Sequence, residues 1–100
     1  MNKLTNNQKK FLRARGHALK PIVMVGQHGL SEAVLAELES TMDKHELLKI
    51  KVRTEGRDDK QKIIDEILTA TNAHLIQVIG SVMVIYRAFD KEPEIILPRK

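Results

Sequence analysis

The stretch PIVMVGQHGLS, residues 21–31, contains the residues whose types and spacing point most directly to chemistry. Gly26 and Gly29 bracket Gln27 and His28, between an apolar run that predicts a buried strand and an amphipathic segment that predicts a helix. Glycines allow φ > 0 and leave no Cβ between the backbone and a ligand. The unpaired N–H groups at the start of the helix favour an anion, most commonly a phosphate.

The same pattern is compatible with a simpler interpretation. The loop is not a Walker A motif, because no Gly-Lys-Ser/Thr follows, and it is not GxGxxG. Its glycines could serve only to relieve backbone strain in a tight turn. The charges elsewhere in the chain favour the binding interpretation.

Charged residues are segregated along the chain, which has a formal net charge of +4. Residues 1–31 contain cations and no acid, residues 32–46 are mostly acidic, and residues 49–62 are mostly basic again. Such segregation produces a one-sided field that favours a polyanionic partner. The candidate binding residues are Lys9, Lys10, Arg13, Lys20, Gly26, Gln27, His28, Gly29, Lys49, Lys51 and Arg53.

A first helix is expected to carry the N-terminal cations. Thr5 and Gln8 fit a capping box at its start, and Gly16 fits its end. Lys9 and Arg13 are four residues apart and therefore lie on one side of it. Because no acid intervenes, we expect this helix and the glycine loop to form one continuous basic surface.

The alternation in LLKIKVR, residues 47–53, predicts a strand with one buried face. Its apolar side chains would face the core. Its open face would carry a basic stripe of Lys49, Lys51 and Arg53.

Two more helices are indicated. Ser31 fits the N-cap of an acidic helix over residues 32–46. A third helix is expected to begin with a capping box of Asp58 and Gln61 and to end near Asn72.

Residues 74–80 and 82–87 are apolar runs joined at Gly80-Ser81, which indicates a two-residue hairpin. Two successive right-handed crossovers place the second and third helices on the same face of the sheet. The order α-β-α-β-α-β-β therefore predicts a single α/β domain over residues 1–100, a two-layer sandwich with the other sheet face partly open. The tail, about residues 91–100, is expected either to be disordered or to lie extended along a sheet edge.

Length and composition exclude several classes of protein. One hundred residues form one domain with a modest core, and the absence of cysteine excludes disulfides and thiolate metal sites. No apolar segment approaches the ~20 residues that cross a bilayer, and the polar N-terminus does not resemble a signal peptide. We therefore expect a soluble, cytoplasmic, monomeric protein without a cofactor, metal, membrane contact or small-molecule substrate.

Three separated motifs resemble the bacterial YhbY family, the stand-alone form of the chloroplast RNA splicing and ribosome maturation (CRM) domain. They are PIVMVGQHGLS, HELLKIKV from His45 to Val52, and IQVIGSVMVIYR from Ile76 to Arg87. The closing LPRK is similar as well, and the resemblance runs from about Thr5 to the C-terminus.

The resemblance implies a fold like the C-terminal domain of translation initiation factor 3. The mixed four-stranded sheet would have the order 1-2-4-3, with the last strand antiparallel to the others. It also implies RNA binding, with Gly26 and Gly29 as the family's GxxG, and association with precursors of the large ribosomal subunit. Because Gln27 and His28 provide no lysine in the loop, Lys20 and the first helix would provide the phosphate charge instead.

Other classes of function receive less support. An enzyme would have to use His17, His28, His45 or His74, and none has metal-ligand or nucleophile–base spacing. No helix combines Arg, Asn and Gln into a face that reads DNA bases. The alternative that remains open is a protein-interaction module on the ribosome or an assembly factor, using the acidic helix 32–46 without direct RNA binding.

Overall fold

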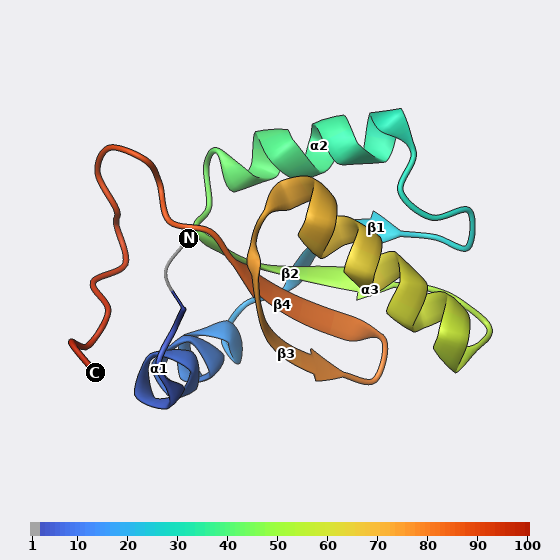
Figure 1. Ribbon diagram of the computed structural model, residues 1–100. Coiled ribbons are helices and arrows are strands. Elements are labelled where there is room, and N and C mark those ends of the chain that lie inside the picture. Colours follow the sequence, from blue (N-terminus) through green and yellow to red (C-terminus); the bar gives the residue numbers. More distant parts are fainter. Residues whose placement is uncertain (1–2) are drawn as a thin grey trace.

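The computed structural model describes residues 3–100 and contains a four-stranded sheet with three helices (Figure 1). In chain order, the elements are α1 (Asn6–Gly16), β1 (Pro21–Val25), α2 (Glu32–Met42), β2 (Leu47–Val52), α3 (Arg57–Thr71), β3 (His74–Ile79) and β4 (Val82–Tyr86). The predicted order of helices and strands is confirmed.

The sheet has the order β1-β2-β4-β3. Strands β1 and β2 are parallel, and β4 is antiparallel to both of its neighbours. The predicted mixed sheet, with its last strand antiparallel to the others, is therefore confirmed. The register pairs Lys49 with Val84 and Lys51 with Val82 on β4, so the two lysines project from the same face of the sheet.

Helices α2 and α3 cover one face of the sheet, and the main core lies beneath them. The alternation of β2 places Leu48, Ile50 and Val52 in this core, where each is almost fully buried. Helix α2 contributes Leu38, and α3 contributes Ile67. The two right-handed crossovers thus place both helices on one side, as the sequence predicts.

Helix α1 and the C-terminal tail lie on the opposite face, where they form a second, smaller core (Figure 1). Leu12 of α1 is fully buried against Leu47 and Tyr86. Gly16 approaches β4 closely, since a Cβ on it would lie 3.2 Å from a methyl carbon of Val84. The helix therefore covers only part of this face and leaves the part nearer the glycine loop open.

The tail folds back over α1. Ile95 and Leu97 pack against the second core, and the Gln8 side chain donates a hydrogen bond to the Pro98 carbonyl oxygen at 2.8 Å. Residues 91–100 contain no strand. Neither expected alternative, disorder or an extended segment on a sheet edge, describes this arrangement.

The first two predicted helix caps are confirmed. Thr5 and Gln8 exchange both hydrogen bonds of a capping box, and the Ser31 hydroxyl accepts one from the Val34 amide at 3.2 Å. The predicted capping box of Asp58 and Gln61 is wrong. Because α3 begins earlier, both residues lie within the helix, and the N-cap Gly56 has no side chain to accept a bond.

The acidic helix predicted over residues 32–46 is shorter than expected. Helix α2 ends at Met42, and the chain turns from there into β2. The acids of the last residues therefore do not belong to the helix surface.

Candidate nucleic-acid interface

Three loops meet at one end of the sheet (Figure 1). Since β1 and β2 are parallel, the glycine loop after β1 and the loop after β2 leave from the same end. The Arg53 amide donates to the Val25 carbonyl at 2.9 Å, and the Val52 amide donates to Ser81 of the β3–β4 turn at 2.7 Å. We call this part of the molecule the loop end.

A shallow hollow of about 560 Å³ lies at the loop end. Its lining residues include Gln27 from the glycine loop, Lys51 and Arg53 from β2 and its loop, and Ser81 from the β3–β4 turn. An ammonium, a guanidinium, an amide and a hydroxyl can all donate to phosphate or sugar oxygens. One carboxylate, that of Glu55, also lines the hollow.

The glycine loop is a closed turn in which the two glycines have different roles. Gly29 has a φ of +80°, and its amide donates to the Gly26 carbonyl at 3.0 Å. Gly29 therefore needs glycine for its backbone conformation. Gly26 does not adopt positive φ, so its backbone conformation does not require glycine.

A Cβ on Gly26 would project into open space, because no heavy atom apart from those of its chain neighbours would lie within 4 Å of it. Gln27 and His28 are exposed at the tip of the turn. The fold alone thus gives no reason for glycine at position 26, and the space beside it is accessible to a ligand.

Acidic groups lie on the other side of the loop. A carboxylate oxygen of Glu66 is 3.6 Å from the Cβ position of Gly29, and Glu32 occupies the first turn of α2. These charges weaken the attraction of the α2 N-terminus for an anion. The side facing Lys51 and Arg53 is electrostatically more favourable.

Lys49 and Lys51 lie on the open face of the sheet, and both are partly buried. The Lys49 ammonium donates to the Leu19 carbonyl oxygen at 3.0 Å. This bond directs Lys49 toward the segment between α1 and β1, while Lys51 borders the loop-end hollow. Lys49 and Lys51 therefore lie on the open face as predicted, with different surroundings, whereas Arg53 lies just beyond the end of β2.

The cations of α1 are not brought to the loop end. Lys20 precedes β1 and Gly26 follows it, which separates them by roughly 20 Å of extended chain. A β-strand and the open sheet face lie between α1 and the glycine loop (Figure 1), so a continuous surface would have to run across that face, and it stays a prediction.

The three candidates on α1 also differ among themselves. Lys10 is exposed, whereas Lys9 and Arg13 are partly buried. The Arg13 Nε is buried and has no hydrogen-bond partner within residues 3–100.

Burial lowers the pKa of His74, and the charge of the nearby Lys9 lowers it further. His74 begins β3 and stacks on Tyr86, with 6.2 Å between ring centroids.

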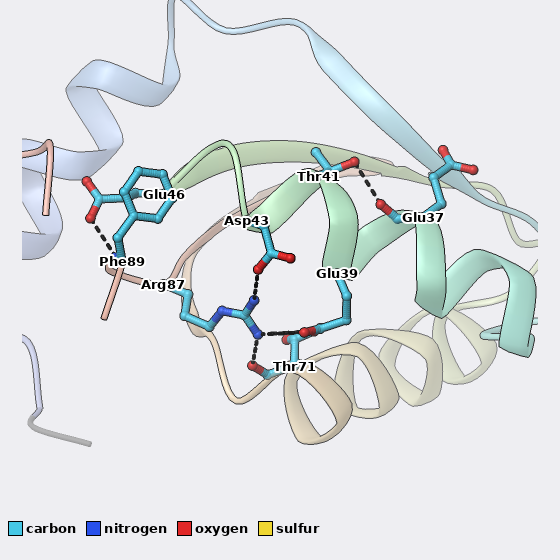
Figure 2. A network of polar contacts seen from close by, with 8 residues as sticks. All are labelled: Glu37, Glu39, Thr41, Asp43, Glu46, Thr71, Arg87 and Phe89. Carbon is cyan, nitrogen blue, oxygen red and sulfur yellow. Dashed lines mark hydrogen bonds and ion pairs between the residues drawn. The ribbon is translucent and has the colours of Figure 1, made fainter. Parts of the chain in front are cut away.

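Three acids of residues 32–46 are engaged within the domain (Figure 2). Glu39 and Asp43 contact the guanidinium of Arg87. Glu46 is 3% exposed, and its carboxylate accepts hydrogen bonds from the amides of Phe89 (2.8 Å), Glu94 (2.9 Å) and Ile95 (2.6 Å).

Sequence reasoning did not select some residues at the loop end. The Lys60 ammonium donates a hydrogen bond to the Gly80 carbonyl oxygen at 2.9 Å. This bond connects the β3–β4 turn to the first turns of α3. Thr54 and Ser81 line the hollow. Lys60 belongs to the basic segment 49–62, so its charge was visible, but only the tertiary fold brings it beside the hairpin turn.

Within residues 3–100, no three His, Asp or Glu side chains gather as a metal ion would require. None of the helices described there has the length and apolar character needed to cross a membrane.

The chain forms a small α/β domain with a mixed β1-β2-β4-β3 sheet. Helices α2 and α3 cover one face of the sheet, α1 packs on the other face, and the loop end is basic. The family model of the CRS1 / YhbY (CRM) domain matches residues 4–87. The chain belongs to this family.

Similar proteins support the assignment. A Haemophilus influenzae protein named "RNA-binding protein" is 46% identical over 100 residues, which covers both chains completely. The "Probable RNA-binding protein PA4753" of Pseudomonas aeruginosa is 43% identical over 84 residues, 84% of this chain and 81% of the relative. The solution structure of SAV1595 from Staphylococcus aureus has a TM-score of 0.81 and 38% identity, covering 96% of this chain and 100% of that one.

Proposed function

We propose that the chain binds ribosomal RNA in precursors of the large ribosomal subunit and acts in the assembly of that subunit. The observation that carries the proposal is the hollow at the loop end, where Gln27, Lys51 and Arg53 come together from separate parts of the sequence. The names of the relatives support RNA as the ligand. The association with the large subunit rests on the resemblance to the YhbY family.

The proposed binding is dominated by the RNA backbone. The donors around the hollow suit phosphate and 2′-hydroxyl oxygens, which are the groups that a structured RNA displays. Only 3% of the residues are aromatic, so extensive stacking of bases on rings is not available. Recognition then depends mainly on the shape of the RNA and the positions of its phosphates.

The alternative, a protein-interaction module based on the acidic segment 32–46, is less well supported by the geometry. Glu46 is buried, and Glu39 contacts Arg87 at 3.0 Å. Asp43 lies 3.8 Å from Arg87, but its side chain is 77% exposed. The exposed acids of the segment are Glu32, Glu37 and Asp43. Isolated carboxylates on an exposed surface make a weak electrostatic surface for a basic partner.

Sedimentation of a cell lysate tests the proposal. We expect the wild-type protein in the fractions that contain precursors of the large subunit, and the Arg53→Glu variant mainly in the free fractions. Lys91→Glu is the matched control, because Lys91 is an exposed cation in the tail, away from the loop end. The proposal is wrong if the wild-type protein is found only in free or small-subunit fractions at low salt.

A further inference from the structure

A second hollow, of about 220 Å³, lies on the open face of the sheet beside the end of α1. We call it the sheet hollow. Gly16 and His17 border it on the helix side, and Lys49, Gln77, Ile79 and Val84 are among the strand residues that line it. Gly16 lets the end of α1 approach β4 closely here, because a Cβ on it would lie 3.2 Å from a methyl carbon of Val84.

The face around this hollow combines exposed aliphatic side chains with cations. Ile22 is 50% exposed, Met24 is 55% exposed and Ile79 is 59% exposed. Lys49 and Lys51 project from the same face on β2, which lies between β1 and β4 in the sheet. No carboxylate is among the residues that line the hollow. This surface, apolar with interspersed lysines, is complementary to a ligand that is flat and apolar in one part and anionic in another.

We propose that the sheet hollow receives one unpaired nucleobase of the bound RNA, while Lys49 and Lys51 contact phosphates on either side of it. The inference rests on the proposed function and adds that the RNA must offer a nucleotide outside a helix. Sequence-specific RNA recognition generally uses such unpaired bases.

The size of the hollow agrees with a single base. Pockets for drug-sized ligands measure about 300–1,000 Å³, so a hollow of about 220 Å³ suits a smaller group. The faces of a base would pack against Ile79 and the neighbouring valines. Its polar edge would meet the Gln77 amide and the His17 imidazole, each of which can donate and accept.

The position of the hollow also agrees with an RNA strand that continues from the loop end. Lys51 borders the loop-end hollow, and Lys49 lines the sheet hollow two residues before it on β2. An RNA strand crossing both hollows would meet Arg53, Lys51 and Lys49 in turn. Although Lys49 donates one hydrogen bond to Leu19, its ammonium has two more protons for a phosphate.

The test compares two RNA hairpins, one carrying a single bulged 4-thiouridine and the other identical but without the bulge. Affinities are measured at one fixed salt concentration for the wild-type protein, Ile79→Ser and Ile22→Ser. Ile22 is a matched control, because it is similarly exposed on the same face but does not line the hollow. Thermal melts verify that both variants are folded.

We expect Ile79→Ser to lose about fivefold in affinity for the bulged hairpin, because the base no longer buries the apolar side chain of Ile79. Its affinity for the fully paired hairpin should stay within about twofold of the wild type, since phosphate contacts are unchanged. Ile22→Ser should match the wild type on both RNAs. Photocrosslinks from the bulged base should map to residues 77–84.

Other outcomes overturn the inference. Equal affinities of Ile79→Ser and the wild type for the bulged hairpin, or crosslinks confined to the glycine loop, remove the base from this hollow but leave the proposed function intact. A wild-type dimer in sedimentation equilibrium that Ile79→Ser dissociates assigns the hollow to self-association instead. If the wild type binds neither hairpin at low salt, the proposed function and the inference both fail.

Discussion

The guanidinium of Arg87 contacts both carboxylate oxygens of Glu39, with its Nη1 3.1 Å from Oε1 and 3.0 Å from Oε2. The same nitrogen donates to the Thr71 carbonyl oxygen at 2.9 Å, and Nη2 lies 3.8 Å from Asp43 (Figure 2). One side chain therefore joins the end of β4 to α2 and to the C-terminal end of α3. It also pairs with Glu39, one of the acids that the alternative function would use.

Replacing Arg87 should destabilise the domain without affecting the loop end. We expect Arg87→Ala to lower the free energy of unfolding by about 2 kcal/mol, because it removes a partly buried cation together with its hydrogen bonds. Urea unfolding measures the change. Lys91→Ala, at an exposed position, should change stability by less than about 0.5 kcal/mol, and an equal effect of the two variants would contradict the structural role of Arg87.

Glu46 should hold the tail in place. Its buried carboxylate accepts three amide protons, from Phe89, Glu94 and Ile95. Glu46→Gln replaces one accepting oxygen by a donor, so we expect a loss of about 2 kcal/mol and faster hydrogen exchange at the amides of the tail. Glu92→Gln, at an exposed tail position, is the control. Unchanged exchange at Ile95 would show that the tail is held without Glu46.

The two loop glycines should respond differently to substitution. Gly26 has ordinary φ and open space around it, so Gly26→Asp should leave the melting temperature nearly unchanged. If RNA phosphate lies beside the loop, the new charge should reduce affinity at least ~10-fold, about 1.4 kcal/mol. Gly29 is a less suitable test position, because its φ of +80° and the nearby Glu66 carboxylate would make an aspartate there destabilising.

Titrations of both variants against large-subunit RNA, with thermal melts in parallel, separate these effects. We expect Gly29→Asp to lower the melting temperature and Gly26→Asp to lower affinity alone. An RNA affinity of Gly26→Asp equal to that of the wild type would leave the loop as a structural turn.

RNA binding should depend strongly on salt. With ~4–6 phosphates neutralised, a plot of log affinity against log salt concentration should have a slope of about −3 to −5. Arg53→Gln removes one phosphate contact and should reduce the magnitude of this slope by about 1. Gln removes the charge while keeping a polar side chain that can donate hydrogen bonds. A slope near zero for the wild type would contradict backbone-dominated binding.

Stability should decrease as the pH falls through the range of histidine titration. Burial, with a contribution from Lys9, lowers the pKa of His74 in the folded protein below its ordinary value of 6.5. The unfolded chain therefore takes up the proton first, and stability is lost progressively below about pH 6.5. Melting temperatures measured between pH 5 and pH 8 should show a smaller pH dependence for His74→Gln. An identical profile would assign the effect to other groups.

The sequence predicted those elements whose signals are local. The alternation of Leu48, Ile50 and Val52 identifies β2 and its buried face, and the pair Thr5 and Gln8 identifies the start of α1, because each pattern involves neighbouring residues. The order of the strands came from the family resemblance.

The features that were missed depend on contacts between distant residues. The position of α1 is determined by the packing of Leu12 against Leu47 and Tyr86, which periodicity along one helix does not reveal. The tail is positioned by Glu46, whose surface-like residue type gives no sign of burial. At the candidate site, the lack of acids suggested one surface from Lys20 to Gly26, but it did not reveal that the two residues lie at opposite ends of β1.

The C-terminus and the loop end lie at opposite ends of the sheet (Figure 1), which helps in measuring binding. The C-terminal tail lies beside α1, at the end of the sheet away from the three loops (Figure 1). The chain contains no cysteine, so a cysteine appended after Lys100 provides a unique thiol for a fluorophore. Such a label is remote from the glycine loop and the loop-end hollow, and its rotational anisotropy reports the formation of a large complex without occupying the surface under study.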